Sequence, residues 1–136
     1  MSVVHVRVRV AGEHYALPVE QVLEVADLGA IASVPGSPAA LIGVRNLRGQ
    51  VIPVIDLATL LGLTGDQPGR IVVAESGEVR AGLLVNEVLD VGELPPVSEQ
   101  VESRYLLGAC LVDGELVGAL DVDAVLAPIA PPGGSA

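Results

Sequence analysis

Two internal repeats constrain the fold of this chain more than any other feature. Residues 19–25 read VEQVLEV and residues 85–91 read VNEVLDV, an offset of 66 positions. Residues 43–57 read GVRNLRGQVIPVIDL, and residues 108–122 read GACLVDGELVGALDV at an offset of 65. A near-constant offset over two separate blocks indicates one structural unit built twice, not an array of many short repeats.

The two copies share their apolar positions but differ in charge. Arg48 of the first copy corresponds to Asp113 of the second. The chain carries a net charge of −10, yet Arg45 and Arg48 are the only charged residues between positions 28 and 55. We therefore expect a local positive spot on an acidic protein, and we place function in the difference between the copies. The acidic balance argues against nucleic acid or an anionic membrane surface as a partner.

Composition and turn spacing predict an all-β fold with short helices. Hydrophobic residues make up 51% of the 136 residues, and the β-branched residues among them favour strands. Short apolar runs alternate with turn signals, which is typical of small barrels. Each half has about 65 residues and would be marginal alone, so the halves should share apolar surface. The prediction is two pseudo-repeated five-stranded β-barrels packed together.

The repeats also suggest boundaries along the chain. We expect a single domain over residues 3–127, with a first barrel at about 11–68. The second barrel is expected at about 69–121 together with the N-terminal strand, followed by a short helix over 121–126. The tail, residues 128–136, is rich in Pro, Gly, Ser and Ala and is predicted to be disordered.

Catalytic and metal-binding chemistry finds little support in the sequence. Asp56 and Asp121 occupy equivalent positions, so a two-lobed aspartyl enzyme is an alternative from another class. Each Asp, however, precedes a short apolar helix and suits an N-cap. His5 and His14 lack metal-ligand spacing, and the lone Cys110 reads as a buried structural thiol. We predict a protein that is not an enzyme and has no metal and no cofactor.

Residues 43–57 resemble the signature of CheW-like chemotaxis coupling proteins, above all in the run NLRGQVIPVIDL. The resemblance continues through residues 15–25 and 82–91 to Leu120-Asp121 and its helix, and so covers roughly residues 3–126. It implies two five-stranded β-barrels. It also implies a non-catalytic chemosensory adaptor that couples a CheA-type histidine kinase to the cytoplasmic tip of chemoreceptors.

The resemblance further implies a receptor-binding site in a groove at the barrel junction. The matching positions are Val22, Glu24, Asn46, Leu47, Arg48 and Gly49. Val22 would give apolar contact, Arg48 would pair bidentately with a receptor carboxylate, and Glu24 would be the complementary negative group. Each has a structural alternative: Val22 as core, Glu24 as a solvated strand residue, Arg48 as a hairpin residue.

The expected partners are the regulatory domain of the kinase, the receptor tip and other CheW-like domains, all in the cytoplasm. The longest apolar runs are only a few residues, so no membrane insertion is expected. The connections at residues 63–70 and 92–104 look shorter than is usual in the family, and Asn86 replaces a common acid. A receptor-binding array modulator that does not recruit the kinase is therefore the alternative function.

Overall fold

The computed structural model of the chain describes residues 3–65 and 67–129. Within them lie ten strands in two five-stranded sheets and four short helical segments. The strands are β1 (Val3–Val10), β2 (Glu13–Pro18), β3 (Val22–Asp27), β4 (Leu41–Leu47), β5 (Gln50–Asp56), β6 (Arg70–Ser76), β7 (Val79–Val85), β8 (Glu87–Leu94), β9 (Leu106–Val112) and β10 (Glu115–Leu120). The helices are η1 (Val19–Gln21), α1 (Leu57–Leu60), α2 (Val122–Leu126) and η2 (Ala127–Ile129). The predicted fold class is confirmed.

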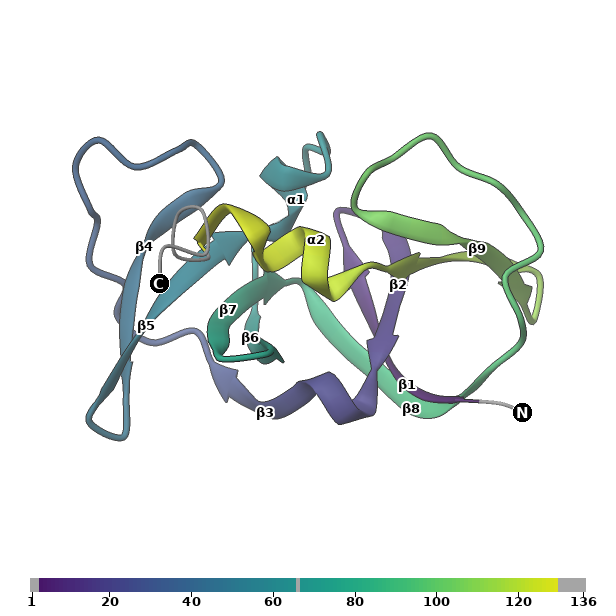
Figure 1. The fold of residues 1–136 in the computed structure, drawn as a ribbon, viewed down its shortest axis with the longest axis horizontal. Coiled ribbons are helices and arrows are strands. Elements are labelled where there is room, and N and C mark those ends of the chain that lie inside the picture. Colours follow the sequence, from purple (N-terminus) through teal and green to yellow (C-terminus); the bar gives the residue numbers. More distant parts are fainter. Residues whose placement is uncertain (1–2, 66, 130–136) are drawn as a thin grey trace.

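The two sheets lie side by side and have equivalent strand orders (Figure 1). The order is β8-β1-β2-β10-β9 in one sheet, here called the β1 sheet, and β3-β6-β7-β5-β4 in the other, the β3 sheet. Exchanging each of β1 to β5 with the strand five places later converts one order into the other. The sequence repeat is therefore a repeat of structure, with β1 to β5 in the first copy and β6 to β10 in the second.

The sheets divide the chain differently from the barrels expected at residues 11–68 and at residues 69–121 together with the N-terminal strand, because β2 lies with β8 to β10, and β6 and β7 lie with β3 to β5. The β1 sheet joins the first hairpin of the first repeat, β1–β2, to the last three strands, whereas the β3 sheet joins the first hairpin of the second repeat, β6–β7, to β3, β4 and β5. The chain crosses between sheets after the second strand of each repeat, at η1 and at Asn86. Each sheet is then completed by a parallel pair, β10 with β2 and β5 with β7. Such pairs form only between strands distant along the chain, so local turn signals do not reveal them.

The main hydrophobic core lies between the sheets and draws residues from both. Val8 of β1 and Leu83 of β7 are 0% and 1% exposed, and both belong to this cluster. Helix α2 follows β10 of the β1 sheet but packs on β6 and β7 of the β3 sheet. Its Val125 and Leu126 are buried in the same cluster. The halves therefore share one core, as the marginal size of each half requires.

Each sheet has a smaller cluster on its other face. In the β3 sheet this cluster contains Ile52, Val54 and Ile71. In the β1 sheet it contains Cys110, which is 1% exposed, so the predicted burial of the thiol is confirmed. Burial raises the pKa of the Cys110 thiol, and the charge of Arg7 lowers it by a smaller amount. Of the tail predicted to be disordered, residues 128–129 lie in η2 and residues 130–136 lie outside the described part.

Candidate protein-binding site at the Arg48 hairpin

The tight turn between β4 and β5 presents Arg48 to solvent. Arg48 and Gly49 both have positive φ, 53° and 83°, as the central residues of a type I′ hairpin turn do. The side-chain oxygen Oδ1 of Asn46 accepts a hydrogen bond from the backbone N–H of Gly49 at 2.9 Å, which stabilises the turn. The Arg48 side chain is 81% exposed. β4 and β5 therefore form a hairpin with a tight turn, which Asn46 and Gly49 shape.

An ion pair connects this turn to β3. Nη1 of Arg48 lies 3.1 Å from Oε2 of Glu24, whose side chain is 29% exposed. Strands β3 and β4 stand at opposite ends of their sheet, so this contact shows that the sheet curls until its edges approach each other. A second contact across the same opening runs from Nε of Arg45 to the carbonyl oxygen of Leu28 at 3.1 Å. An exposed pair of this kind contributes at most about 1 kcal/mol to stability. Its main effect is to fix the positions of the two charged side chains.

A shallow groove of about 270 Å³, here called the Arg48 groove, lies beside the ion pair. It is lined by Leu23, Glu24, Leu47, Arg48, Gln50, Ile52, Val73 and Arg80. The structure thus brings together three of the predicted residues, Glu24, Leu47 and Arg48. All the lining residues belong to the β3 sheet and its β4–β5 turn, so the groove does not lie at the barrel junction that the resemblance implied. Leu23, 43% exposed, adds apolar surface on β3. Apolar side chains flanked by an Arg are a usual composition for a protein-binding surface.

Val22 lies apart from Glu24 and Arg48. It is half-buried on β3, is paired with Ala74, and packs against the core between the sheets. A register shift between Val22 and Glu24 separates the two residues along the strand. Val22 is not among the described residues that line the Arg48 groove. Its observed contacts are those of a core residue.

Sequence reasoning missed the groove residues that come from the second repeat. Val73 and Arg80 lie on β6 and β7, which enter the β3 sheet through the exchange between repeats. Arg80 is opposite Glu75 in the β6–β7 register. Its charge within an otherwise apolar strand could have marked Arg80 as outward-facing, but not as a neighbour of the Arg48 hairpin.

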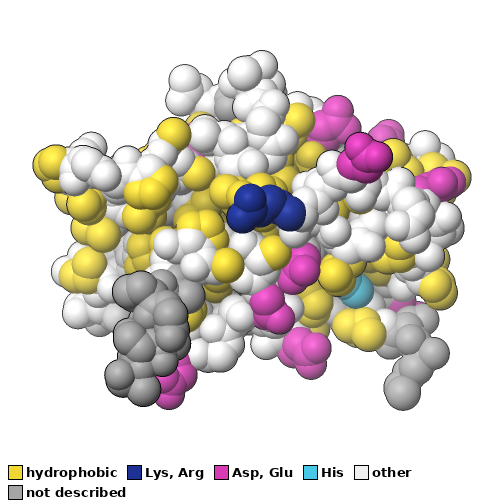
Figure 2. All heavy atoms as spheres, turned by 45° about the horizontal axis from the view of Figure 1, so that its top comes forward, with side chains coloured by type: hydrophobic (Ala, Val, Ile, Leu, Met, Phe, Trp, Pro, Cys, Tyr) yellow, Lys and Arg dark blue, Asp and Glu magenta, His cyan; other side chains and the backbone are white. Residues whose placement is uncertain are grey.

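Exposed apolar side chains are a general property of this surface. Figure 2 shows apolar side chains spread over much of one face, with basic side chains confined to a small area and acidic ones more widely distributed. Among the most exposed are Val51 on β5 at 62%, and Leu107 and Leu111 on β9 at 64% and 58%. A protein that displays this much apolar surface is suited to docking other proteins.

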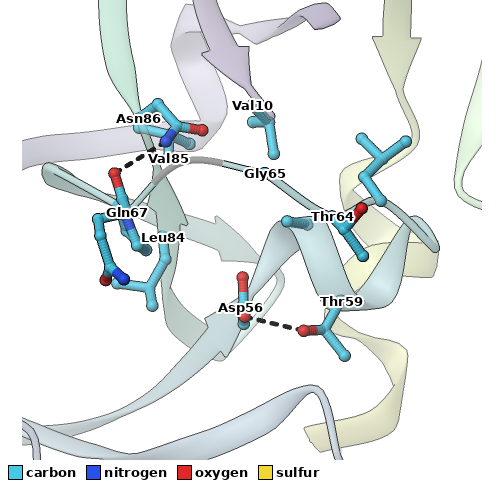
Figure 3. A pocket seen from close by; sticks show the side chains of 12 residues that line it. Val10, Asp56, Thr59, Thr64, Gly65, Gln67, Leu84, Val85 and Asn86 are labelled. Carbon is cyan, nitrogen blue, oxygen red and sulfur yellow. Dashed lines mark hydrogen bonds between the residues drawn. The ribbon is translucent and has the colours of Figure 1, made fainter. Parts of the chain in front are cut away.

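The two equivalent aspartates do not meet in one pocket. Asp56 lines a polar pocket of about 330 Å³ beside α1, where its Oδ2 accepts a hydrogen bond from Oγ1 of Thr59 at 2.8 Å (Figure 3). Asp121 is not among the described residues that line that pocket; its Oδ1 accepts the backbone N–H of Ala124 at 3.2 Å and caps α2. The shared proton of a two-aspartate enzyme needs adjacent carboxylates, whereas each of these carboxylates bonds a group of the short helix that follows it. In the described part of the chain no His, Cys, Asp and Glu side chains cluster as metal ligands would.

Asp56 and Asp121, which stand at the N-termini of α1 and α2, should differ in their contribution to the stability of the fold. Asp121→Ala removes a side-chain cap and is expected to lower the free energy of unfolding by about 1 kcal/mol. Asp56→Ala is the matched comparison and should cost less, because the Asp56 side chain bonds a hydroxyl rather than a backbone N–H. Urea denaturation of the two variants measures the difference. A larger loss for Asp56→Ala would contradict the assignment of the cap to α2 alone.

Comparison with known proteins decides the family. Residues 5–129 match the family model of the CheW-like domain. The chain belongs to the CheW-like family. It is similar to the chemotaxis protein CheW of Thermotoga maritima, with 36% identity over 120 residues that cover 82% of this chain and 77% of the relative. Protein FrzA of Myxococcus xanthus is 30% identical over 116 residues, covering 78% and 72% of the two chains.

The fold comparison agrees. The crystal structure of the scaffolding protein TtCheW from Thermoanaerobacter tengcongensis matches with a TM-score of 0.79 and 28% identity, over 90% of this chain and 86% of that one. The resemblance seen in the sequence is thereby confirmed, and this CheW-like protein is a scaffold or adaptor of chemotaxis signalling. In residues 3–65 and 67–129, no helix has the length and hydrophobicity that crossing a bilayer requires.

Proposed function

We propose that this CheW-like protein is a non-catalytic cytoplasmic adaptor that couples a CheA-type histidine kinase to the cytoplasmic tip of chemoreceptors. The receptor tip docks at the Arg48 groove. The observation that carries this assignment is the Glu24–Arg48 pair, 3.1 Å apart, at the edge of an open groove with apolar walls. It rests on residues that the sequence resemblance already singled out.

The chemistry of the groove favours a partner with mixed apolar and charged groups. Leu23 and Leu47 offer apolar surface that a partner side chain would desolvate. The Arg48 guanidinium has five N–H donors, and its Nη1 donates to Glu24. The remaining N–H groups can bind a partner carboxylate bidentately. Glu24 then disfavours a partner that places a second carboxylate beside it.

The kinase regulatory domain and other CheW-like domains dock elsewhere on this chain. The β9–β10 hairpin supports this part of the proposal, since Leu107, Leu111 and Leu116 are 64%, 58% and 51% exposed and belong to the other sheet. Two separate docking faces allow one chain to hold two partners at once. Individually weak contacts then suffice, because in an array the other contacts raise the effective concentration.

The second candidate function is a receptor-binding array modulator that does not recruit the kinase. It is motivated by the connections at residues 63–70 and 92–104, which look shorter than is usual in the family. Loops of this kind contribute to kinase-facing surfaces in the family.

Separate calorimetric titrations with the purified kinase regulatory domain and with a receptor cytoplasmic tip test both functions. Binding to each partner is the expected result. Binding to the receptor tip alone would favour the modulator, and binding to neither would contradict both assignments.

A further inference from the structure

The Arg48 groove continues into a second hollow on the same sheet. This hollow has a volume of about 550 Å³ and runs between the tips of the β4–β5 and β6–β7 hairpins. Gln50, Ile52 and Arg80 line both hollows, so the two are arms of one depression with Arg80 at their junction. A partner segment that lies along the first arm would therefore pass Arg80.

Two long hydrogen bonds hold the Arg80 side chain in place and leave other N–H groups of its guanidinium available to a partner. Its Nε lies 3.4 Å from Oε1 of Glu75, and its Nη1 lies 3.4 Å from Oε1 of Gln50. Both distances are longer than the 2.7–2.9 Å or so of a strong charge-assisted hydrogen bond. The side chain is 43% exposed. A guanidinium in this setting can donate hydrogen bonds to a partner carboxylate while Glu75 holds the Arg80 side chain in its orientation.

The other half of the molecule lacks this pair of arginines. At the offsets of the repeat, Arg48 corresponds to Asp113, Gln50 to Glu115 and Arg80 to His14. Nε2 of His14 lies 4.0 Å from Oε2 of Glu115, so the geometry of the Arg80–Gln50 contact recurs with an acid in place of the amide. Arginines at these two positions are thus particular to the β3 sheet, although the two sheets have equivalent strand orders.

We propose that Arg80 is a second docking residue of the Arg48 groove and sets its specificity. The partner segment presents two carboxylates, one to Arg48 and one to Arg80, with an apolar side chain between them that contacts Leu23 and Leu47. The inference rests on the proposed function, because it takes the partner to be the receptor tip. It deepens that function by stating which side chains the tip must carry.

The test is calorimetric titration of the receptor tip with Arg80→Gln, which removes the charge but keeps an amide that can reach Glu75. Arg70→Gln is the matched control: Arg70 is also paired with an acid, Asp27 at 2.9 Å, and its side chain is 52% exposed. Arg70 lines neither arm of the groove. We expect Arg80→Gln to weaken binding of the tip by about fivefold or more, as interface arginines do, and Arg70→Gln by less than about twofold.

The outcomes separate the inference from the function on which it rests. Wild-type affinity in Arg80→Gln, beside weakened binding in Arg48→Glu, overturns the role of Arg80 and leaves the proposed function standing. A wild-type chain that does not bind the tip overturns both. Equal losses for the tip and for the kinase regulatory domain would also overturn the inference, because they would indicate a general change of structure. Arg80→Lys, which keeps the charge, is expected to restore part of the affinity that Arg80→Gln loses.

Discussion

Leu83→Ala is expected to lower the free energy of unfolding by about 2–5 kcal/mol, the usual cost of emptying a buried leucine site. Leu83 is 1% exposed and lies in the core that both sheets share. Because each sheet contains strands from both repeats, neither sheet is a contiguous piece of chain that can fold by itself. The variant should therefore still unfold in a single transition, at a lower urea concentration and with an unchanged denaturant slope.

Leu107→Ala is the matched control for this prediction. It removes the same atoms from a side chain that is 64% exposed, and surface changes of this kind usually stay within about 0.5 kcal/mol. Two separate transitions in Leu83→Ala, one of them at the wild-type midpoint, would contradict the shared core. Such a result would mean that the two sheets are independent domains.

Arg48→Glu is expected to weaken binding of the receptor tip at least tenfold, a loss of about 1.4 kcal/mol of binding free energy. The substitution replaces the exposed cation of the hairpin by a carboxylate beside Glu24, so the groove loses its partner for a receptor carboxylate and gains a repulsive charge. The fold should be unaffected, since the exposed ion pair contributes little to stability. Titration calorimetry measures the affinity, and thermal unfolding checks the fold.

Arg104→Glu controls for the change in net charge. Arg104 is exposed, lies in the connection between β8 and β9, and stands 5.4 Å from the centre of the Tyr105 ring. Its replacement changes the net charge by the same amount, so it should leave receptor affinity within about twofold of wild type. Equal weakening in both variants would show long-range repulsion rather than a contact. Loss of cooperative unfolding in Arg48→Glu would make Arg48 a structural residue of the hairpin.

The local parts of the fold were predictable because local chemistry determines them. Arg48-Gly49 and Asp113-Gly114 both form tight turns with positive φ, and the spacing of apolar runs around them predicts the hairpins. The duplication and the shared core follow from the repeat and the small size of each half. These features depend on neighbours in sequence or on the repeat itself.

The assignment of strands to sheets was not predictable from the same signals. The exchange depends on where the chain crosses after β2 and β7, and a three-residue helical turn at η1 and a single residue, Asn86, make those crossings. The same lack of information affects the candidate site. Glu24 and Arg48 are 24 residues apart and were paired only through the family resemblance. Arg80 lines the same groove but comes from the other repeat. Val22 was grouped with Glu24 and Arg48 by its motif, whereas it packs against the core between the sheets.

In the proposed adaptor, one chain holds two partners at once on separate faces. Sedimentation velocity of the chain with a kinase regulatory domain and a receptor cytoplasmic tip, each at concentrations above its own dissociation constant, tests it directly. We expect a ternary complex whose sedimentation coefficient exceeds that of either binary complex. When Arg48→Glu replaces the wild-type chain, this complex should lose only the receptor tip. Mutually exclusive binding of the two partners, with only binary complexes in the mixture, would contradict it.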